Sequence, residues 1–245
     1  MTKKIHINFV DFENNIENCK LIMENNKNLL FSKTNYDFLI CFGGDGNFLE
    51  ILKQEYTNKI NIIHYGTGHL NFLSNFKDNN DNFNYDNFCE YGILKIEIDN
   101  VKFIAINEIE IFKINSTSKY VLNIDCNKFY EFQATGFVVN TSIGSTGINR
   151  TIGGPLFFNN DLFCFNELLP VKSINSKTLS QPMIFSNQEL LFENLWNDND
   201  FIIKIDGKSL NINSWKFIKI NLVKSCAKIN INYTAWLESI NKKLI

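Results

Sequence analysis

The stretch Leu39-Ile-Cys-Phe-Gly-Gly-Asp-Gly-Asn-Phe-Leu49 runs from an apolar segment into a glycine-rich turn that carries one carboxylate, Asp45. Residues 37–42 are typical of a buried strand, and Asn47 is predicted to cap a helix that ends near Tyr56. Glycines let backbone N–H groups approach phosphate oxygens closely, and a helix N-terminus adds partial positive charge. The stretch therefore predicts a strand, a turn and a helix around a phosphate site that contains a base.

This turn matches neither of the two common phosphate-binding motifs. It lacks the Lys-Ser/Thr ending of a P-loop, and its glycines are not spaced as Gly-x-Gly-x-x-Gly. Taken alone, the segment also fits an ordinary tight turn in which Asp45 is a local capping group. Other segments of the chain have to decide between the two interpretations.

The first ninety residues alternate between strand and helix patterns. Such alternation is typical of βαβ units and predicts a Rossmann-like α/β domain with a parallel sheet. The helix that follows the glycine turn is expected to bury Phe48, Leu49, Ile51 and Leu52. The predicted strands cover 4–10, 37–42 and 61–65, and the predicted helices cover 13–30 and 47–56.

From about Gly92 the pattern changes to short segments rich in β-branched and aromatic residues, which predicts an all-β, sandwich-like domain. The expected strands cover 93–98, 102–106, 108–114, 120–124, 128–132, 136–140, 201–205 and 216–222. Residues 235–244 are expected to form an amphipathic helix that packs back on the first domain. We therefore expect an α/β domain over 1–92, a β-rich domain over 93–228 and a returning C-terminal segment over 229–245.

Composition restricts the class of protein. The chain has 245 residues, 44% of them hydrophobic, and its 24 basic and 26 acidic side chains give a net charge of -2. This balance offers no electrostatic footprint for nucleic acid or an anionic membrane. The six cysteines form no Cys-x-x-Cys pair and are expected to be buried reduced thiols, and we predict no metal-ligand cluster. The N-terminal apolar stretch is too short for a signal peptide, so we expect a cytoplasmic protein.

A second segment, 135–155, is dense in glycine, serine and threonine. Its centre, Gly144-Ser-Thr-Gly147, can offer backbone amides and hydroxyls to phosphate or ribose oxygens, and the absence of bulk admits a flat ring. The alternative is a flexible surface loop. The isoleucines at 143, 148 and 152 favour a packed element instead.

Two further segments place polar or aromatic groups beside strands. Asn107 and Glu108 interrupt the apolar strand predicted around them, and a buried polar pair needs partners. The pair either ties down neighbouring backbone or contacts the ribose hydroxyls or base edge of a ligand, and this strand alone does not decide between the two. Phe72 follows the strand at 61–65 and is expected near the domain junction, where core packing is the simpler use of its ring.

In combination, these segments resemble the NAD kinase family, in the same order along most of the chain. The Asn-Glu pair and the Gly-Ser-Thr-Gly loop select this family, since the Gly-Gly-Asp-Gly turn also occurs in lipid kinases and phosphofructokinases. The family's Gly-Gly-Asp-Gly-Thr motif corresponds to 43–47, its Gly-x-Leu-Gly-Phe-Leu motif to 68–73, its Asn-Glu pair to 107–108 and its hydroxyl-rich loop to 141–155. Residues 178–182 and 206–208 match two further family segments.

The resemblance implies transfer of a phosphoryl group to the 2′-hydroxyl of the adenosine ribose of NAD, giving NADP. ATP is the donor, or polyphosphate in some members, and Mg²⁺ or another divalent cation accompanies ATP. Asp45 is implied as the base or orienter of the hydroxyl, and the family implies a homodimer or homotetramer. The NAD- and ATP-binding residues implied are Gly44, Asp45, Gly46, Phe72, Asn107, Glu108, Gln133, Thr135, Thr146, Gly147, Ile148, Asn149, Arg150 and Thr151.

Three positions depart from the family pattern. Thr135 stands where an Asp is usual, Gly147-Ile148 where Ala-Tyr is usual, and Gln133 where Arg is common. All three positions concern NAD rather than Asp45, so we expect weaker NAD binding with retained chemistry. The alternatives are a catalytically weak nucleotide-binding or sensing protein of the same fold, and a lipid or sugar kinase that shares the Gly-Gly-Asp-Gly turn.

Overall fold

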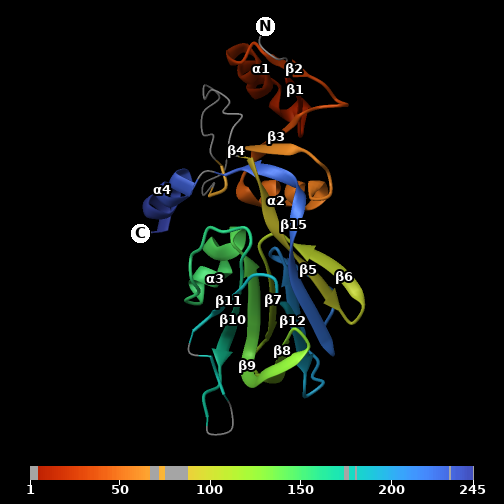
Figure 1. Cartoon of the computed structure of the whole chain (residues 1–245), viewed down its shortest axis with the longest axis vertical. Coiled ribbons are helices and arrows are strands. Elements are labelled where there is room, and N and C mark those ends of the chain that lie inside the picture. Colours follow the sequence, from red (N-terminus) through yellow and green to blue (C-terminus); the bar gives the residue numbers. More distant parts are fainter. Residues whose placement is uncertain are drawn as a thin grey trace. The chain divides into compact units, whose positions relative to one another are not determined.

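The computed structural model describes residues 5–66, 72–74, 88–173, 177–179, 181–231 and 233–244. The chain forms two compact units (Figure 1). The first unit combines Met1–Tyr91 with Ser225–Ile245, and the second consists of Gly92–Lys224. Two strands, β5 (Phe88–Ile98) and β15 (Phe217–Asn230), carry the chain from one unit into the other. The functional roles given to 1–92, 93–228 and 229–245 remain predictions.

The first unit is built on a parallel sheet with the strand order β2, β1, β3, β4, β15. The strands are β1 (Ile5–Phe9), β2 (Leu29–Phe31), β3 (Phe38–Gly43), β4 (Asn61–Gly66) and the end of β15. All of these pairs are parallel, which confirms the predicted α/β organisation. The helical segments are η1 (Phe12–Asn15), α1 (Ile16–Asn25), α2 (Asp45–Glu55) and α4 (Tyr233–Leu244).

The helix predicted over 13–30 is shorter than expected. It consists of η1 and α1, and the chain leaves the helix at Asn26, whose side-chain amide donates to the carbonyl of Ile22 at 2.9 Å. Three residues later Leu29 begins β2 and pairs with Ile5 of β1. Burial of Leu29 in the sheet outweighs the helical pattern of the sequence at this point.

The core of the first unit lies between the sheet and its helices. Cys19 and Ile22 of α1 pack with residues of β1, β3 and β4 such as Ile40 and Ile63. Helix α2 contacts β3, and its Phe48, Leu49, Ile51 and Leu52 are buried as predicted.

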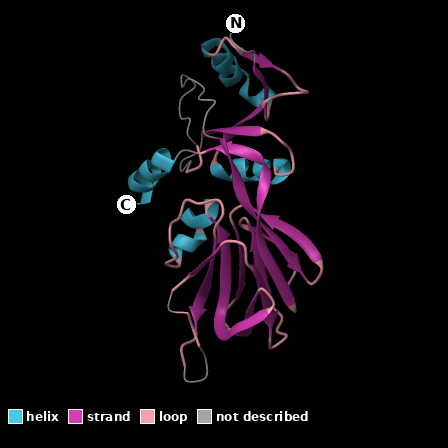
Figure 2. Cartoon of the chain, in the orientation of Figure 1, coloured by secondary structure: helices cyan, strands magenta, loops and turns pink. Residues whose placement is uncertain are grey.

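The second unit is largely β, as predicted, and Figure 2 shows strands in most of it. Its central strand, β9 (Asn127–Thr141), pairs antiparallel with β7 (Glu108–Lys113), β8 (Ser118–Ile124) and β10 (Phe163–Pro170). The remaining strands are β6 (Val101–Ala105), β11 (Met183–Phe185), β12 (Glu189–Asn194), β13 (Phe201–Ile205) and β14 (Lys208–Ser209), joined by the short helical segments η2 (Ile143–Thr146) and α3 (Ile148–Thr151). The sequence patterns missed β10, β11, β12 and β14.

The two strands predicted over 128–132 and 136–140 are one continuous strand, β9. Gly136 makes this possible, because a Cβ at this position would lie 1.9 Å from the carbonyl oxygen of Ile111 on β7. The glycine therefore serves close approach of two strands rather than a turn. Phe137 follows it and stacks on Phe192 with ring centroids 4.1 Å apart in an aromatic core.

Two further expectations can be compared with the described residues. Cys19, Cys41 and Cys164 are buried free thiols as expected, whereas Cys126 and Cys226 are exposed and correct that expectation. Cys226 lies on the uncovered face of β15, which short apolar context alone does not reveal, and Cys126 lies in the turn between β8 and β9. Within the described part of the chain, no helix is long and apolar enough to cross a membrane.

Candidate functional site

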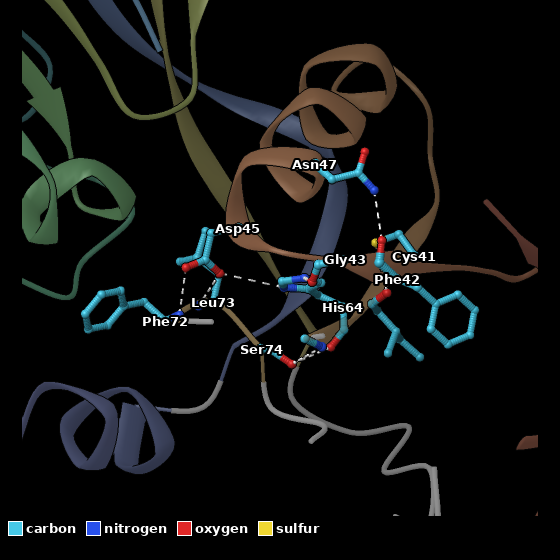
Figure 3. Close-up of polar contacts among 11 residues, drawn as sticks. Cys41, Phe42, Gly43, Asp45, Asn47, His64, Phe72, Leu73 and Ser74 are labelled. Atoms are coloured by element: carbon cyan, nitrogen blue, oxygen red, sulfur yellow. Dashed lines mark hydrogen bonds and ion pairs between the residues drawn. The ribbon is translucent and has the colours of Figure 1, made fainter. Parts of the chain in front are cut away.

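The glycine turn between β3 and α2 starts the helix earlier than predicted. Gly44 is the N-cap residue and Asp45 is the first helical residue, so the prediction that Asn47 caps the helix is wrong. Gly43 has φ 128°, a conformation that favours glycine and reverses the chain tightly at the end of β3. Asn47 instead donates its side-chain amide to the carbonyl of Phe42 at 2.8 Å, which ties α2 to the strand (Figure 3).

The carboxylate of Asp45 is held by the backbone of a second segment. The N–H of Phe72 donates to Oδ2 at 2.8 Å, and the N–H of Leu73 donates to Oδ1 at 3.2 Å (Figure 3). The Asp45 side chain remains 22% exposed, and a carboxylate can accept more hydrogen bonds than these two. The N-terminus of α2 also favours a negative charge at this position. Asp45 is thus fixed in orientation and still able to accept a hydrogen bond from a ligand.

Sequence reasoning missed the residue behind Asp45, His64. Its Nδ1 lies 4.0 Å from Oδ1 of Asp45, and its side chain is only 2% exposed. The Nε2–H donates to the carbonyl of Gly43 at 2.8 Å, and the ring stacks on Phe48 of α2. The one signal in the sequence is a titratable side chain within the apolar strand at 61–65.

Burial is the main influence on the pKa of His64. It lowers the pKa below the ordinary value of 6.5, because the charged ring loses its hydration. The carbonyl of Gly43, the charge of Asp45 and the backbone of Leu73 oppose this effect and raise the pKa. The balance leaves the imidazole neutral at pH 7.

The segment that holds Asp45 is itself anchored to β4. Ser74 donates its hydroxyl to the carbonyl of His64 at 2.9 Å and accepts the N–H of Gly66 at 2.8 Å. Phe72 is buried. Residues 68–71 of the second predicted motif lie outside the described residues.

In the second unit, Asn107 and Glu108 lie at the break between the strands predicted over 102–106 and 108–114. They do not lie inside one strand: β6 ends at Ala105, β7 begins at Glu108, and the chain bends between them. The carboxylate of Asp206 accepts the backbone N–H groups of Ile106, Asn107 and Glu108, at 3.0, 2.7 and 3.3 Å. These amides turn toward a side chain instead of a neighbouring strand, which is why the pairing is interrupted.

The side chains of this bend carry unused hydrogen-bonding capacity. Among the described residues, neither Oε2 of Glu108 nor Oδ1 of Asn107 has a hydrogen-bond partner, although both atoms are buried. Burial, followed by the negative charges of Asp206 and Glu110, raises the pKa of Glu108 to about 8. Glu108 is therefore a neutral acid at pH 7 and can both donate and accept a hydrogen bond.

The glycine-rich loop packs directly against this bend. A Cβ on Gly144 would lie 2.3 Å from the carbonyl oxygen of Asn107, and one on Gly147 would lie 3.3 Å from Oε2 of Glu108. The N–H of Thr141 donates to the carbonyl of Asn107 at 2.9 Å. The loop forms η2 and α3 with Ile143 buried, so the alternative of a flexible surface loop is wrong.

The other predicted loop residues differ in exposure. Asn149 is fully buried and donates its side-chain amide to the carbonyl of Pro155 at 2.9 Å, which closes the loop. Thr151 donates its hydroxyl to the carbonyl of Ile148 at 2.8 Å. Gly147, Arg150 and Thr151 are exposed, while Thr146 and Ile148 are partly buried.

The structure does not bring Gln133 and Thr135 to the bend. Both lie on β9, whose Asn140 is the register partner of Glu108. At about 3.3 Å per residue, Thr135 is roughly 17 Å along the strand from that partner. Gln133 donates its side-chain amide to the hydroxyl of Thr117 at 2.8 Å.

Comparisons with known proteins agree with this fold and these motifs. No model of a known protein family matches the chain. The chain is 27% identical over 228 residues to the NAD kinase of Ureaplasma parvum serovar 3, covering 88% of this chain and 84% of that protein. It is 24% identical over 211 residues to the NAD kinase of Mycoplasma pneumoniae, covering 80% of each.

Two solved structures share the fold. An NAD kinase from Archaeoglobus fulgidus in complex with ATP matches 97% of this chain and 97% of that one, with a TM-score of 0.71 and 20% identity. Yeast NADH kinase complexed with NADH matches 100% of this chain and 88% of that one, with a TM-score of 0.74 and 14% identity. In its motifs, its curated relatives and its fold, the chain is similar to the NAD kinase family.

Proposed function

We propose that this protein is an NAD kinase, which transfers the terminal phosphoryl group of ATP to the 2′-hydroxyl of the adenosine ribose of NAD. The observation that carries the proposal is the carboxylate of Asp45, fixed at the N-terminus of α2 by two backbone amides and still open to a ligand. Two curated relatives that match four-fifths of the chain or more are NAD kinases. No comparison favours a lipid or sugar kinase.

In this proposal Asp45 orients the 2′-hydroxyl and accepts its proton as the new oxygen–phosphorus bond forms. The amides of Phe72 and Leu73 restrict the orientation of the carboxylate, which reduces the cost of positioning the hydroxyl. Mg²⁺ or another divalent cation reaches the site with ATP as part of the substrate and neutralises the phosphate charges. Gly44 and Gly46 leave space for the nucleotide.

In the second unit we propose that Asn107 and Glu108 bind the base and ribose of NAD. The support is chemical: each carries a buried oxygen without a partner among the described residues, and the neutral Glu108 carboxyl can donate to a ribose oxygen. Thr146, Gly147, Ile148, Asn149, Arg150 and Thr151 are proposed to surround the dinucleotide, and Phe72 to line the adenine pocket. Gln133 and Thr135 remain proposed NAD contacts, with weaker NAD binding expected from the departures at 133, 135, 147 and 148.

The test is NADP formation from NAD and MgATP by the wild type and by Asp45→Asn. Asparagine keeps the size of the side chain and one oxygen, which can accept the amide of Phe72, but its NH₂ group can accept neither the amide of Leu73 nor a proton. We expect kcat to fall by about 10²- to 10⁴-fold, and the melting temperature to fall slightly because one of the two amide contacts is lost. Asp37→Asn is the matched control, because the exposed Asp37 also accepts a backbone amide, that of His6 at 2.9 Å.

The possible results separate the alternatives. Unchanged turnover in Asp45→Asn would mean that another group is the base. Binding of NAD without turnover in the wild type would favour a sensing protein, and no binding at millimolar NAD would exclude a dinucleotide site. The expected homodimer or homotetramer is a separate proposal, to be checked by light scattering.

A further inference from the structure

The ring of His64 is held in a single orientation. It lies face to face with Phe48, with centroids 4.4 Å apart and planes 8° from parallel. Its Nε2 is 2.8 Å from the carbonyl oxygen of Gly43. The carbonyl itself is set by the tight turn at Gly43. Strand, helix and turn therefore fix both the plane of the ring and its rotation within that plane.

This orientation decides which nitrogen carries hydrogen. A carbonyl oxygen only accepts, so Nε2 must be the protonated nitrogen. In the neutral ring, Nδ1 is then a lone-pair acceptor, and among the described residues it has no hydrogen-bond partner. It faces Oδ1 of Asp45 at 4.0 Å (Figure 3). Two acceptors thus face each other with room for one proton between them.

The hydrogen bonds of Asp45 also allow its Oδ1 to move closer to Nδ1 of His64. Oδ1 is held by the longer of the two amide contacts, 3.2 Å from Leu73, whereas Oδ2 is held at 2.8 Å by Phe72. A movement of Oδ1 by about 1 Å would bring it within hydrogen-bond distance of Nδ1. The shorter contact to Phe72 can persist during that movement.

We propose that His64 is a positioning residue for Asp45, which takes up at Nδ1 the proton that the carboxylate receives from the substrate hydroxyl. This inference rests on the proposed function of Asp45 as the base. Transfer of the proton to His64 restores the negative charge of Asp45 and makes the ring an imidazolium ion. The two groups then form an ion pair until product leaves. When product has left, the Nδ1–H bond breaks and the proton goes back to Asp45, which passes it to solvent because it is the exposed member of the pair.

The proton steps balance. As the bond between the 2′-oxygen and the γ-phosphorus forms, the bond from that phosphorus to the bridging oxygen breaks, and ADP leaves with the electron pair. The hydroxyl O–H bond breaks and an O–H bond forms on Asp45. That bond then breaks as the Nδ1–H bond of His64 forms. No oxidant or further reactant is needed.

Among the described residues, few other titratable groups face His64 from the elements around it. On β3 its register partner is Cys41, a thiol whose pKa burial raises far above its ordinary value and which donates to the carbonyl of Ile63. On α2 the facing group is Asp45. On β15, the charged residue paired with β4 is Lys228, whose register partner is Asn61. Asn61 lies about 10 Å along β4 from His64. Asp45 is therefore the charged group that affects the pKa of His64.

The first measurement is an NMR titration of His64 in the wild type and in Asp45→Asn. The chain has three histidines, and the His64 signals are those absent from His64→Gln. We expect the pKa of His64 to fall in Asp45→Asn, because the charge that favours the imidazolium is removed. An unchanged pKa would overturn the inference. This readout does not depend on activity.

The second measurement is the pH dependence of kcat in His64→Gln. A glutamine amide can still donate to the carbonyl of Gly43, but it offers no second nitrogen. We expect kcat to fall about tenfold or more with KM for NAD and MgATP retained. Below the pKa of His64 the ring is already protonated and cannot accept, so the acid limb of the wild-type profile contains an ionisation that His64→Gln lacks.

Phe48→Leu is the control, since it disturbs the ring stack but leaves both nitrogens. We expect it to lower the melting temperature and keep the shape of the pH profile. If His64→Gln keeps the wild-type kcat, or loses kcat with the wild-type profile, His64 only anchors the turn and the inference is overturned. If the wild type forms no NADP at all, the proposed function fails, while the titration still decides whether the pair shares a proton.

Discussion

At the scale of single residues, the Glu108 carboxyl combines strong burial with an oxygen that has no partner among the described residues. Its environment favours the neutral acid, with a pKa of about 8 against an ordinary value of 4.5. A carboxyl held neutral at pH 7 is a hydrogen-bond donor, which an ionised one is not. The burial of this residue thus changes what it can recognise.

Glu108→Gln tests this protonation state. Because the pKa is raised on folding, the stability that the group contributes is fully present below pH 4.5 and is lost as pH rises to about 8. The wild type should therefore lose stability relative to Glu108→Gln between pH 5 and 8, as measured by urea unfolding at several pH values.

The same protonation predicts ligand binding. KM for NAD should rise above pH 8 in the wild type as Glu108 ionises, and it should stay level in Glu108→Gln, which keeps a donor at all pH values. A wild-type KM that is level across this range would show that Glu108 does not donate to NAD.

At the scale of elements, the bend between β6 and β7 depends on a turn that is distant in sequence. Asp206, which follows β13, accepts three backbone amides of the bend. Hydrogen bonds to a charged acceptor contribute more than neutral ones, and removal of the acceptor leaves the amides without a partner. One side chain therefore shapes the segment that carries Asn107 and Glu108.

Asp206→Ala should lower the free energy of unfolding by about 3 kcal/mol and raise KM for NAD. Urea unfolding and initial-rate kinetics measure the two effects. Asp99→Ala is the matched control, because Asp99 likewise accepts the amides of Lys216 and Phe217, but at an exposed turn. Asp99→Ala should lower the free energy of unfolding by less than Asp206→Ala does and leave KM for NAD unchanged. If both variants change KM equally, Asp206 has no specific role in NAD binding.

At the scale of the whole molecule, the first unit is assembled from two separate parts of the chain. After Lys224 the chain returns to it, where Ile229 pairs with Ile62 of β4 and the N–H of Cys226 donates to the carbonyl of Tyr56 at 2.6 Å. The second unit, by contrast, is one continuous segment. Loss of the C-terminal residues should therefore affect the two units unequally.

Truncation after Lys224 should unfold the first unit, because it uncovers the edge of β4 and removes buried side chains such as Ile229 and Trp236. The second unit should keep its slow amide exchange, and NADP formation should be lost. Truncation after Ile231 keeps the pairing of β15 with β4, so the amides of the first unit should exchange more slowly than after the longer truncation. Hydrogen exchange measured by mass spectrometry distinguishes these outcomes, and equal loss in both units would contradict the division.

The sequence alone determined the features that depend on a few neighbouring residues. Strand β3, the glycine turn, the buried face of α2 and the order of motifs along the chain follow from apolar periodicity and residue type. The same patterns misplaced the start of α2 by two residues, because Gly43 and Gly44 allow a tighter turn than an Asn cap would need.

Which side chains meet in the folded protein depends on how distant strands pair. His64 stands 19 residues from Asp45 and reaches it because β3 and β4 pair in a fixed register. Asp206 lies 99 residues from Asn107 and contacts it because β13 pairs with β7. Sheet register joins distant segments through backbone hydrogen bonds that every residue can make, so no local pattern of side chains specifies these pairs.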